Sequence, residues 1–185
     1  MKLSQLLANK KVIASGFAAI VGLSTHSRGA EEVVLSSLAP SVLAEQGVTE
    51  YYALELTRGT VYNTTEEIIA ADLDVRKYQV EHVSSVAAME LVIVSRHKGT
   101  VDLLIKQFGE WTPAPQVLEA VTPEQITGKY VVGTLPPHLI ATARAYTAVT
   151  IKGFDHTKDG DTAGSELAER LIIADKPLRV VELQA

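Results

Sequence analysis

The strongest constraint on the fold is an alternation, from residue 89 onward, of short apolar β-branched runs with segments of helical spacing. The run "MELVIVS" is followed by "TVDLLIKQFG", where apolar residues recur at helical spacing before Gly109 ends the pattern. The same order is then repeated along the chain. The further expected elements are strands at "KYVVGTLP", "AVTIKGF" and "PLRVVEL", and helices at "TPEQITG", "PHLIATARAYT" and "SELAERLII".

Strands that alternate with helices in this way are typical of an α/β domain. Successive parallel strands need a crossover connection, and the predicted helices supply it. We therefore predict a mainly parallel, Rossmann-like sheet flanked by helices over residues 89–185. Residues 1–88 are predicted to form an α+β extension or a small separate domain.

Patterns are weaker in this N-terminal part. "GAEEVVLSSLAPSVLAEQG" is predicted to be helical with a break near Pro40, "EYYALELTRGTVYN" to be a strand with a turn at "TRG", and "DVRKYQVEHV" to be a strand. The apolar run "VIASGFAAIVGL" is either a buried helix or strand or the core of a signal peptide. It is too short to span a bilayer, and no small-x-small cleavage site follows it. A buried element in a cytoplasmic protein is the expectation.

Composition argues against several functions. With 17 basic and 22 acidic side chains the formal charge is -5, so no broad surface for duplex nucleic acid is expected. The absence of cysteine excludes disulfides, thiolate nucleophiles and cysteine-ligated zinc. The glycine motifs GxGxxG, GxxxxGK[ST] and GxSxG are also absent. We predict no cofactor and no membrane partner.

A polar motif follows the first predicted strand of the C-terminal half and consists of Ser95, Arg96, His97, Lys98 and Gly99. In an open parallel sheet, ligands collect at the carboxyl ends of strands, where helix N-termini favour anions. Arg96 and Lys98 would supply charge to a phosphate, and His97 would exchange a proton near neutral pH. The alternative interpretation is a solvated basic loop.

A second motif follows the next strand and consists of Gly133, Thr134, Leu135, Pro136, Pro137 and His138. It also leads into a predicted helix, so both motifs should meet at one rim of the sheet. Gly99 and Gly133 would let the backbone approach a phosphate closely. His138 is either an acid or base at this rim or a capping or packing residue.

A third group of polar residues comprises Asp155, His156, Asp159 and Asp161. These residues fall in a polar stretch without a recognised ligand spacing. An exposed loop is the expected interpretation, and no metal site is predicted.

The first two motifs, followed by "GFD" and "GSEL", resemble a family of CRISPR-associated proteins found beside type III systems. This is the Csx family numbered sixteen, in which a strand ends in R-H-x-G and a later segment reads G-[NT]-L-P-x-H-L. The similarity covers roughly residues 90–183. Where the family carries R-G-x-E-L, this chain has "AGSEL", so the resemblance carries no phosphate contact at Ala163.

The resemblance implies a CARF-like ring nuclease, a phosphodiesterase of antiviral defence. Such an enzyme binds and cleaves cyclic oligoadenylate, here expected to be cyclic tetra-adenylate, and thereby switches off type III CRISPR signalling. Together with the chemistry of the two motifs, it suggests a set of site residues. The catalytic candidates are Arg96, His97 and His138, and the ligand-binding candidates are Ser95, Lys98, Gly99, Gly133, Thr134, Leu135 and Pro136.

The expected mechanism needs no metal. A ribose 2′-hydroxyl would attack the adjacent phosphorus in line, leaving a 2′,3′-cyclic phosphate and a 5′-hydroxyl. A symmetric cyclic ligand fits across a two-fold axis, so a homodimer is expected. Two alternatives stay open: a sponge or sensor that binds cyclic nucleotide without cleaving it, and an interaction or assembly protein without nucleotide activity.

Overall fold

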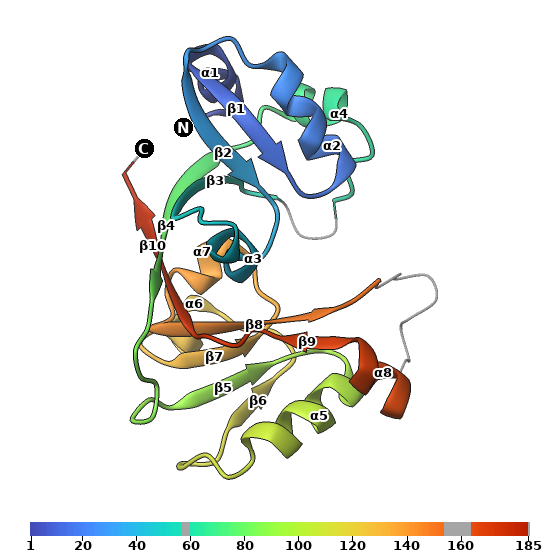
Figure 1. The fold of residues 1–185 in the computed structure, drawn as a ribbon, viewed down its shortest axis with the longest axis vertical. Helices are drawn as coiled ribbons and strands as arrows, with labels where there is room; N and C mark the ends of the chain where they lie inside the picture. The colour runs from blue at the N-terminus through green and yellow to red at the C-terminus, as the bar shows by residue number, and fades with distance from the viewer. Residues whose placement is uncertain (57–59, 154–163, 185) are drawn as a thin grey trace. The chain divides into compact units, whose positions relative to one another are not determined.

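The computed structural model describes residues 1–56, 60–153 and 164–184 (Figure 1). The chain forms two units, Met1–Val80 with Val181–Ala185, and Glu81–Val180. Helices alternate with strands in both, and most strand pairs are parallel. The predicted α/β class with a mainly parallel sheet is therefore confirmed.

The first unit has the strand order β1-β2-β3-β4, with β1, β2 and β3 parallel and β4 antiparallel to β3. Apolar side chains from α1, α2 and α4 pack with these strands in one core. The strands are β1 (Lys10–Ser15), β2 (Glu31–Ser36), β3 (Glu50–Leu54) and β4 (Val75–His82), and the helices are α1 (Leu3–Asn9), α2 (Ala18–Val21), η1 (Gly22–His26), α3 (Pro40–Glu45) and α4 (Thr65–Ala71).

The outer edge of β1 is covered by side chains from its own unit. The backbone N–H groups of Val12 and Ala14 donate to the hydroxyls of Ser27 and Ser24, at 3.0 and 2.9 Å. An uncovered edge strand would be a template for pairing with another chain. The apolar run that starts at Val12 thus forms β1 and α2, which contribute Val12, Ala19 and Ile20 to this core, while Ile13 and Val21 are exposed.

The helix predicted across "GAEEVVLSS" is wrong, because Glu31–Ser36 is strand β2. Its register places Lys10 opposite Glu31 and Lys11 opposite Glu32, and both pairs form salt bridges. Partners on the neighbouring strand thus override the helical preference of the local sequence. The strand expected to begin at Glu50 and the helix expected after the break near Pro40 are confirmed as β3 and α3. The turn predicted at residues 57–59 lies outside the described residues.

The second unit has the strand order β10-β8-β7-β5-β6, with β9 on β8. Strands β6, β5, β7 and β8 are parallel, and β9 and β10 are antiparallel to β8. The strands are β5 (Leu91–Val94), β6 (Gln116–Leu118), β7 (Tyr130–Gly133), β8 (Ala145–Ile151), β9 (Leu171–Ile173) and β10 (Leu178–Leu183), and the helices are α5 (Lys98–Phe108), α6 (Pro123–Ile126), α7 (Pro137–Ile140) and α8 (Gly164–Arg170).

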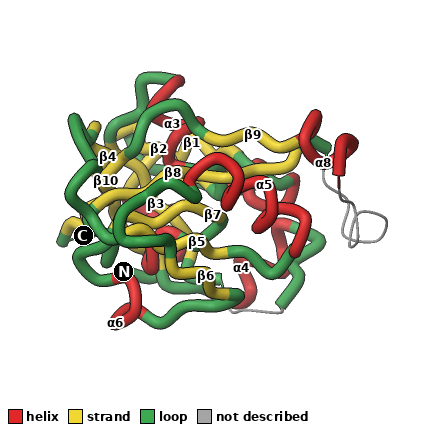
Figure 2. Tube along the Cα trace, turned by 90° about the horizontal axis from the view of Figure 1, so that it is seen from below, coloured by secondary structure: helices red, strands yellow, loops and turns green. Residues whose placement is uncertain are grey.

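Strands β5 and β7 lie side by side, but the chain leaves them in opposite directions. From β5 it passes through α5 to β6, and from β7 it passes through α7 to β8. This reversal is the switch point at which open α/β sheets bind ligands. Helix α5 packs Leu104 against the sheet core. It also contacts α8, which lies near it in Figure 2.

Two predicted helices of this unit are shorter than expected. The helix expected over "PHLIATARAYT" ends at Ile140, because Ala145 already pairs with Tyr130 as the start of β8. The helix expected over "SELAERLII" ends at Arg170, and the last three residues form β9. No helix in the described part of the chain is long and apolar enough to cross a membrane.

Candidate functional site

A cavity of about 380 Å³ lies where the parallel strands of the second unit end. Its walls come from residues 94–97 at the end of β5 and in the loop that follows it, from residues 149–151 at the end of β8, and from Thr100, Glu119 and Thr134. Val94 and Val149 give it an apolar part, while hydroxyl and charged side chains face the rest of the space. The volume is within the range typical of small-molecule sites.

The loop from β5 to α5 is ordered by a local hydrogen bond. The backbone N–H of His97 donates to the Ser95 hydroxyl at 3.2 Å, and the Val101 N–H donates to the His97 carbonyl at 3.0 Å to start the helix. No acidic side chain lies in the first turn of α5. The free N–H groups of this turn and the helix dipole therefore favour an anion.

Thr100 is the least expected residue of the site. It is only 4% exposed, and its hydroxyl oxygen has no hydrogen-bond partner among the described residues. A buried hydroxyl without a partner is destabilising, and such groups are rare in folded proteins. Because Thr100 lines the cavity in the first turn of α5, a ligand there could supply the missing partner.

The end of β7 is packed closely against β5. Gly133 has φ +154°, and a Cβ at this position would lie 2.2 Å from the carbonyl oxygen of Val94. The buried Tyr146 hydroxyl donates to the Gly133 carbonyl at 2.7 Å, and the Thr134 hydroxyl donates to the Val149 carbonyl. Burial raises the pKa of Tyr146, which keeps this phenol in the donating form. Gly133 thus has a structural role in shaping the site.

The cavity carries two exposed charges of opposite sign, Arg96 and Glu119. Within residues 1–56, 60–153 and 164–184, neither side chain forms an ion pair or hydrogen bond. Glu119 is brought to the cavity by β6, whose Leu118 lies opposite Val94 and accepts a hydrogen bond from the Ser95 N–H at 3.1 Å.

The structure brings some of the predicted site residues together. Ser95, Arg96, His97 and Thr134 line the cavity. The others do not line it: Lys98 and Gly99 begin α5, Gly133 ends β7, Leu135 and Pro136 precede α7, and His138 lies in α7. The roles assigned to these residues stay predictions.

Sequence reasoning missed Thr100 and Glu119. Thr100 follows Arg96 in the same loop-to-helix segment. Its position in the first turn of the predicted helix was a sequence signal that it could belong to the site. The sequence around Glu119 gives no indication of a site, because only the pairing of β6 with β5 brings this residue to the cavity. The polar stretch with Asp155, His156, Asp159 and Asp161, like Ala163, lies outside the described residues.

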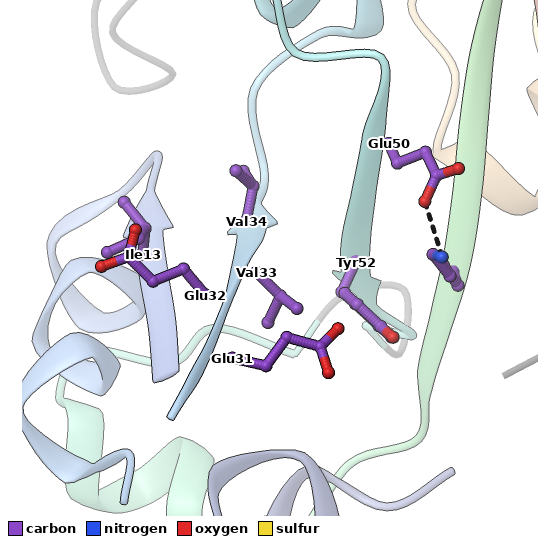
Figure 3. Close-up of a pocket in the computed structure, with 8 residues that line it drawn as sticks. Ile13, Glu31, Glu32, Val33, Val34, Glu50 and Tyr52 are labelled. Carbon is purple, nitrogen blue, oxygen red and sulfur yellow. Dashed lines mark ion pairs between the residues drawn. The ribbon is translucent and has the colours of Figure 1, made fainter. Parts of the chain in front are cut away.

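A second cavity, of about 280 Å³, lies in the first unit beside β2, β3 and β4 (Figure 3). Its three carboxylates are compensated by lysines. Glu50 pairs with Lys77 at 2.6 Å, and Glu31 and Glu32 pair with lysines of β1. The hydrogen bond that Lys77 donates to Glu50 raises the pKa of Lys77, which favours the charged form of the pair. The charges around this cavity have protein partners.

Residues 92–180 match a family model described as "Putative CRISPR-associated protein (Cas_VVA1548)". The match covers most of the second unit and includes every residue that lines its cavity. Residues 92–180 are therefore similar to a CRISPR-associated family, in line with the predicted resemblance, and the match assigns no specific activity. Searches of curated proteins and of solved structures returned no match.

Proposed function

We propose that the cavity of the second unit binds a cyclic oligoadenylate and opens its ring. The observation that carries the proposal is the buried Thr100 hydroxyl, which lacks a partner among the described residues and lines the cavity in the first turn of α5. A phosphate oxygen would accept its hydrogen bond. The CRISPR-associated family of this segment supports a second messenger of that defence as the source of the phosphate.

The surrounding residues fit a phosphodiester. Arg96 offers a fork of N–H donors to the anion, and the first-turn N–H groups of α5 add donors on the side of Thr100. Val94, Val149 and Ile151 offer apolar surface to a ribose or a base. The cavity therefore combines a site for a charged group with a site for an uncharged ring.

The proposed step is a transesterification without a metal. The ribose 2′-oxygen attacks the adjacent phosphorus, the bond from phosphorus to the 5′-oxygen breaks, and a 2′,3′-cyclic phosphate forms. A base takes the 2′-hydroxyl proton, and an acid protonates the departing 5′-oxygen. His97, which lines the cavity, takes one of these roles, and Arg96 stabilises the charge that develops on the phosphorane.

The size of the cavity bears on the oligomeric state. About 380 Å³ is near the lower end of the range for ligand sites and accommodates only part of a cyclic oligonucleotide. A second copy of the chain, related by a two-fold axis, would offer an identical cavity to the opposite side of the ring. The proposal therefore includes a homodimer when the ligand is bound.

The test is incubation with cyclic tetra-adenylate in EDTA, followed by mass spectrometry of the nucleotide. Wild-type protein is expected to give linear products that end in 2′,3′-cyclic phosphate, and the double variant Arg96→Ala, His97→Ala is expected to give none. Lys106→Ala is the matched control, because Lys106 is an exposed cation near the opposite end of α5 and does not line the cavity.

Each alternative has its own outcome. Intact cyclic nucleotide recovered from a stable complex would replace the nuclease with a sponge or sensor. Intact nucleotide without a complex would overturn nucleotide binding and leave an interaction or assembly protein. Full cleavage by the double variant would show that the chemistry lies elsewhere.

A further inference from the structure

Glu119 is a carboxylate in a cavity that is otherwise suited to an anion. It is exposed, and within the described parts of the chain it forms no ion pair or hydrogen bond. The three carboxylates around the first unit's cavity all have lysine partners. An uncompensated carboxylate near a phosphate weakens binding, unless the same ligand offers it a hydrogen-bond donor.

Backbone pairing holds Glu119 in place. It directly follows β6, whose last residue, Leu118, pairs with Val94 and accepts the 3.1 Å hydrogen bond from the Ser95 N–H. Glu119 is therefore fixed beside the loop that carries Arg96. A ligand whose phosphate contacts Arg96 and Thr100 would place its attached base within the same small cavity.

An ionised carboxylate only accepts hydrogen bonds. The exocyclic amines of adenine, cytosine and guanine donate, whereas hypoxanthine has the acceptor O6 where adenine has its N6 amine, and keeps only N1–H as a donor beside it. A carboxylate that faces the group at position 6 of the base would attract the adenine amine and repel the O6 atom of hypoxanthine. Val94 and Val149 supply apolar surface for the ring itself.

We propose that Glu119 selects adenine in this cavity by accepting a hydrogen bond from the N6 amine of the base. The inference rests on the proposed nucleotide binding and adds its base specificity. It assigns to Glu119 a role in discrimination between ligands and no role in ring opening.

The test compares binding of cyclic tetra-adenylate with binding of cyclic tetra-inosinate, in which O6 replaces the amine. Wild-type protein is expected to prefer the adenine ring by about tenfold, the effect of one hydrogen bond to a charged group. Glu119→Ala should lose most of this preference. Glu119→Gln should shift it toward inosine, because the glutamine amide can also donate to O6.

The control is Asp102→Asn, which removes the same charge from an exposed position on α5 that does not line the cavity. It should keep the wild-type preference. If both Glu119 variants bind cyclic tetra-adenylate and cyclic tetra-inosinate more tightly by the same factor, Glu119 only repels phosphate. This result would overturn the inference, while nucleotide binding would stand.

A second measurement separates this inference from the proposed function. Adenosine and inosine 5′-monophosphates are titrated against the same variants. One outcome is that wild-type protein prefers adenosine monophosphate, the Glu119 variants lose this preference, and neither cyclic tetranucleotide binds. In that case base selection stands and the cyclic substrate is wrong. If wild-type protein binds none of the four ligands, both the proposed function and the role of Glu119 are overturned.

Discussion

Each unit of the protein has a cavity with acidic and basic side chains, and the two differ in how these charges are compensated. In the first unit, Glu50 and Lys77 are 2.6 Å apart, and both glutamates of β2 pair with lysines of β1. In the second unit, Arg96 and Glu119 are unpaired among the described residues, and the buried Thr100 hydroxyl lacks a partner there.

The difference indicates which cavity is suited to a ligand. Charges that already have partners contribute to the fold and gain little from a ligand. A buried polar group without a partner, such as the Thr100 hydroxyl, makes the folded protein less stable, and such violations of folding rules are expected at functional sites. The second unit's cavity combines this hydroxyl with the exposed charges of Arg96 and Glu119 at the switch point of its sheet, where α/β folds bind ligands.

The largest expected effect concerns the packing that shapes the second cavity. Gly133→Ala should lower the free energy of unfolding by about 3 kcal/mol, because a Cβ would lie 2.2 Å from the Val94 carbonyl oxygen at a φ of +154°. Gly128→Ala is the control, since Gly128 has φ +75° and no atom within 4 Å of the added Cβ. It should lose about 1 kcal/mol. Urea unfolding measures both, and equal losses would contradict the close packing of β7 on β5.

The next effect compares one cation from each cavity. Arg96→Gln should weaken binding of cyclic tetra-adenylate by about thirtyfold, as expected when a charge-assisted hydrogen bond is lost. Lys77→Gln should leave the affinity unchanged, because Lys77 already pairs with Glu50 in the first unit's cavity. Isothermal titration calorimetry measures both affinities. A larger loss in Lys77→Gln than in Arg96→Gln would reverse the assignment of the ligand to the second unit.

Much of the second unit could be predicted from sequence because its signals are local. The strand β5 is a continuous buried run, and α5 shows helical spacing up to Gly109. The short helix predicted at "TPEQITG" is α6, which begins after Thr122, and Thr122 forms a capping box with Gln125. Arg96 and His97 were found by a rule about strand ends that needs no tertiary contact.

The errors arose where partners are distant in the chain. The glutamates of β2 favour a helix locally, and only their pairing with Lys10 and Lys11 makes a strand favourable. The position of Thr100 in the first turn of a helix could be predicted from sequence, but the missing partner of its hydroxyl is visible only in the structure. Glu119 reaches the cavity only because β6 pairs with β5, so its sequence neighbours contain no sign of a site.

A smaller effect, with opposite signs in two variants, tests the Thr100 hydroxyl. Thr100→Val removes a buried hydroxyl that has no partner among the described residues, and should raise the free energy of unfolding by about 1 kcal/mol. Thr147→Val is the control, because the equally buried Thr147 hydroxyl lies 2.8 Å from the Tyr130 hydroxyl. It should lower stability by about 1 kcal/mol. Thermal and urea unfolding without ligand measure both changes.

The same variants link stability to binding. Thr100→Val should show a smaller rise in melting temperature with cyclic tetra-adenylate than wild-type protein, because the ligand gains one hydrogen bond less. Thr147→Val should keep the wild-type rise. If Thr100→Val is destabilising and binds normally, the hydroxyl belongs to the core and not to the site.

The smallest expected effect contrasts a paired with an unpaired glutamate. A hydrogen bond from Lys10, with the charges of Lys10 and Lys77, lowers the pKa of Glu31 below its ordinary 4.5. The stability that this carboxylate contributes is therefore present above pH 4.5 and lost as the pH falls through the lowered value. Glu31→Gln should destabilise slightly at neutral pH, and the difference from wild type should vanish in acid and shrink in high salt. Glu119→Gln should leave stability at neutral pH unchanged, because its carboxylate has no partner to lose among the described residues. Urea unfolding measures both variants at neutral pH and Glu31→Gln also as a function of pH, and a loss in Glu119→Gln as large as that in Glu31→Gln would mean that the second cavity is compensated like the first.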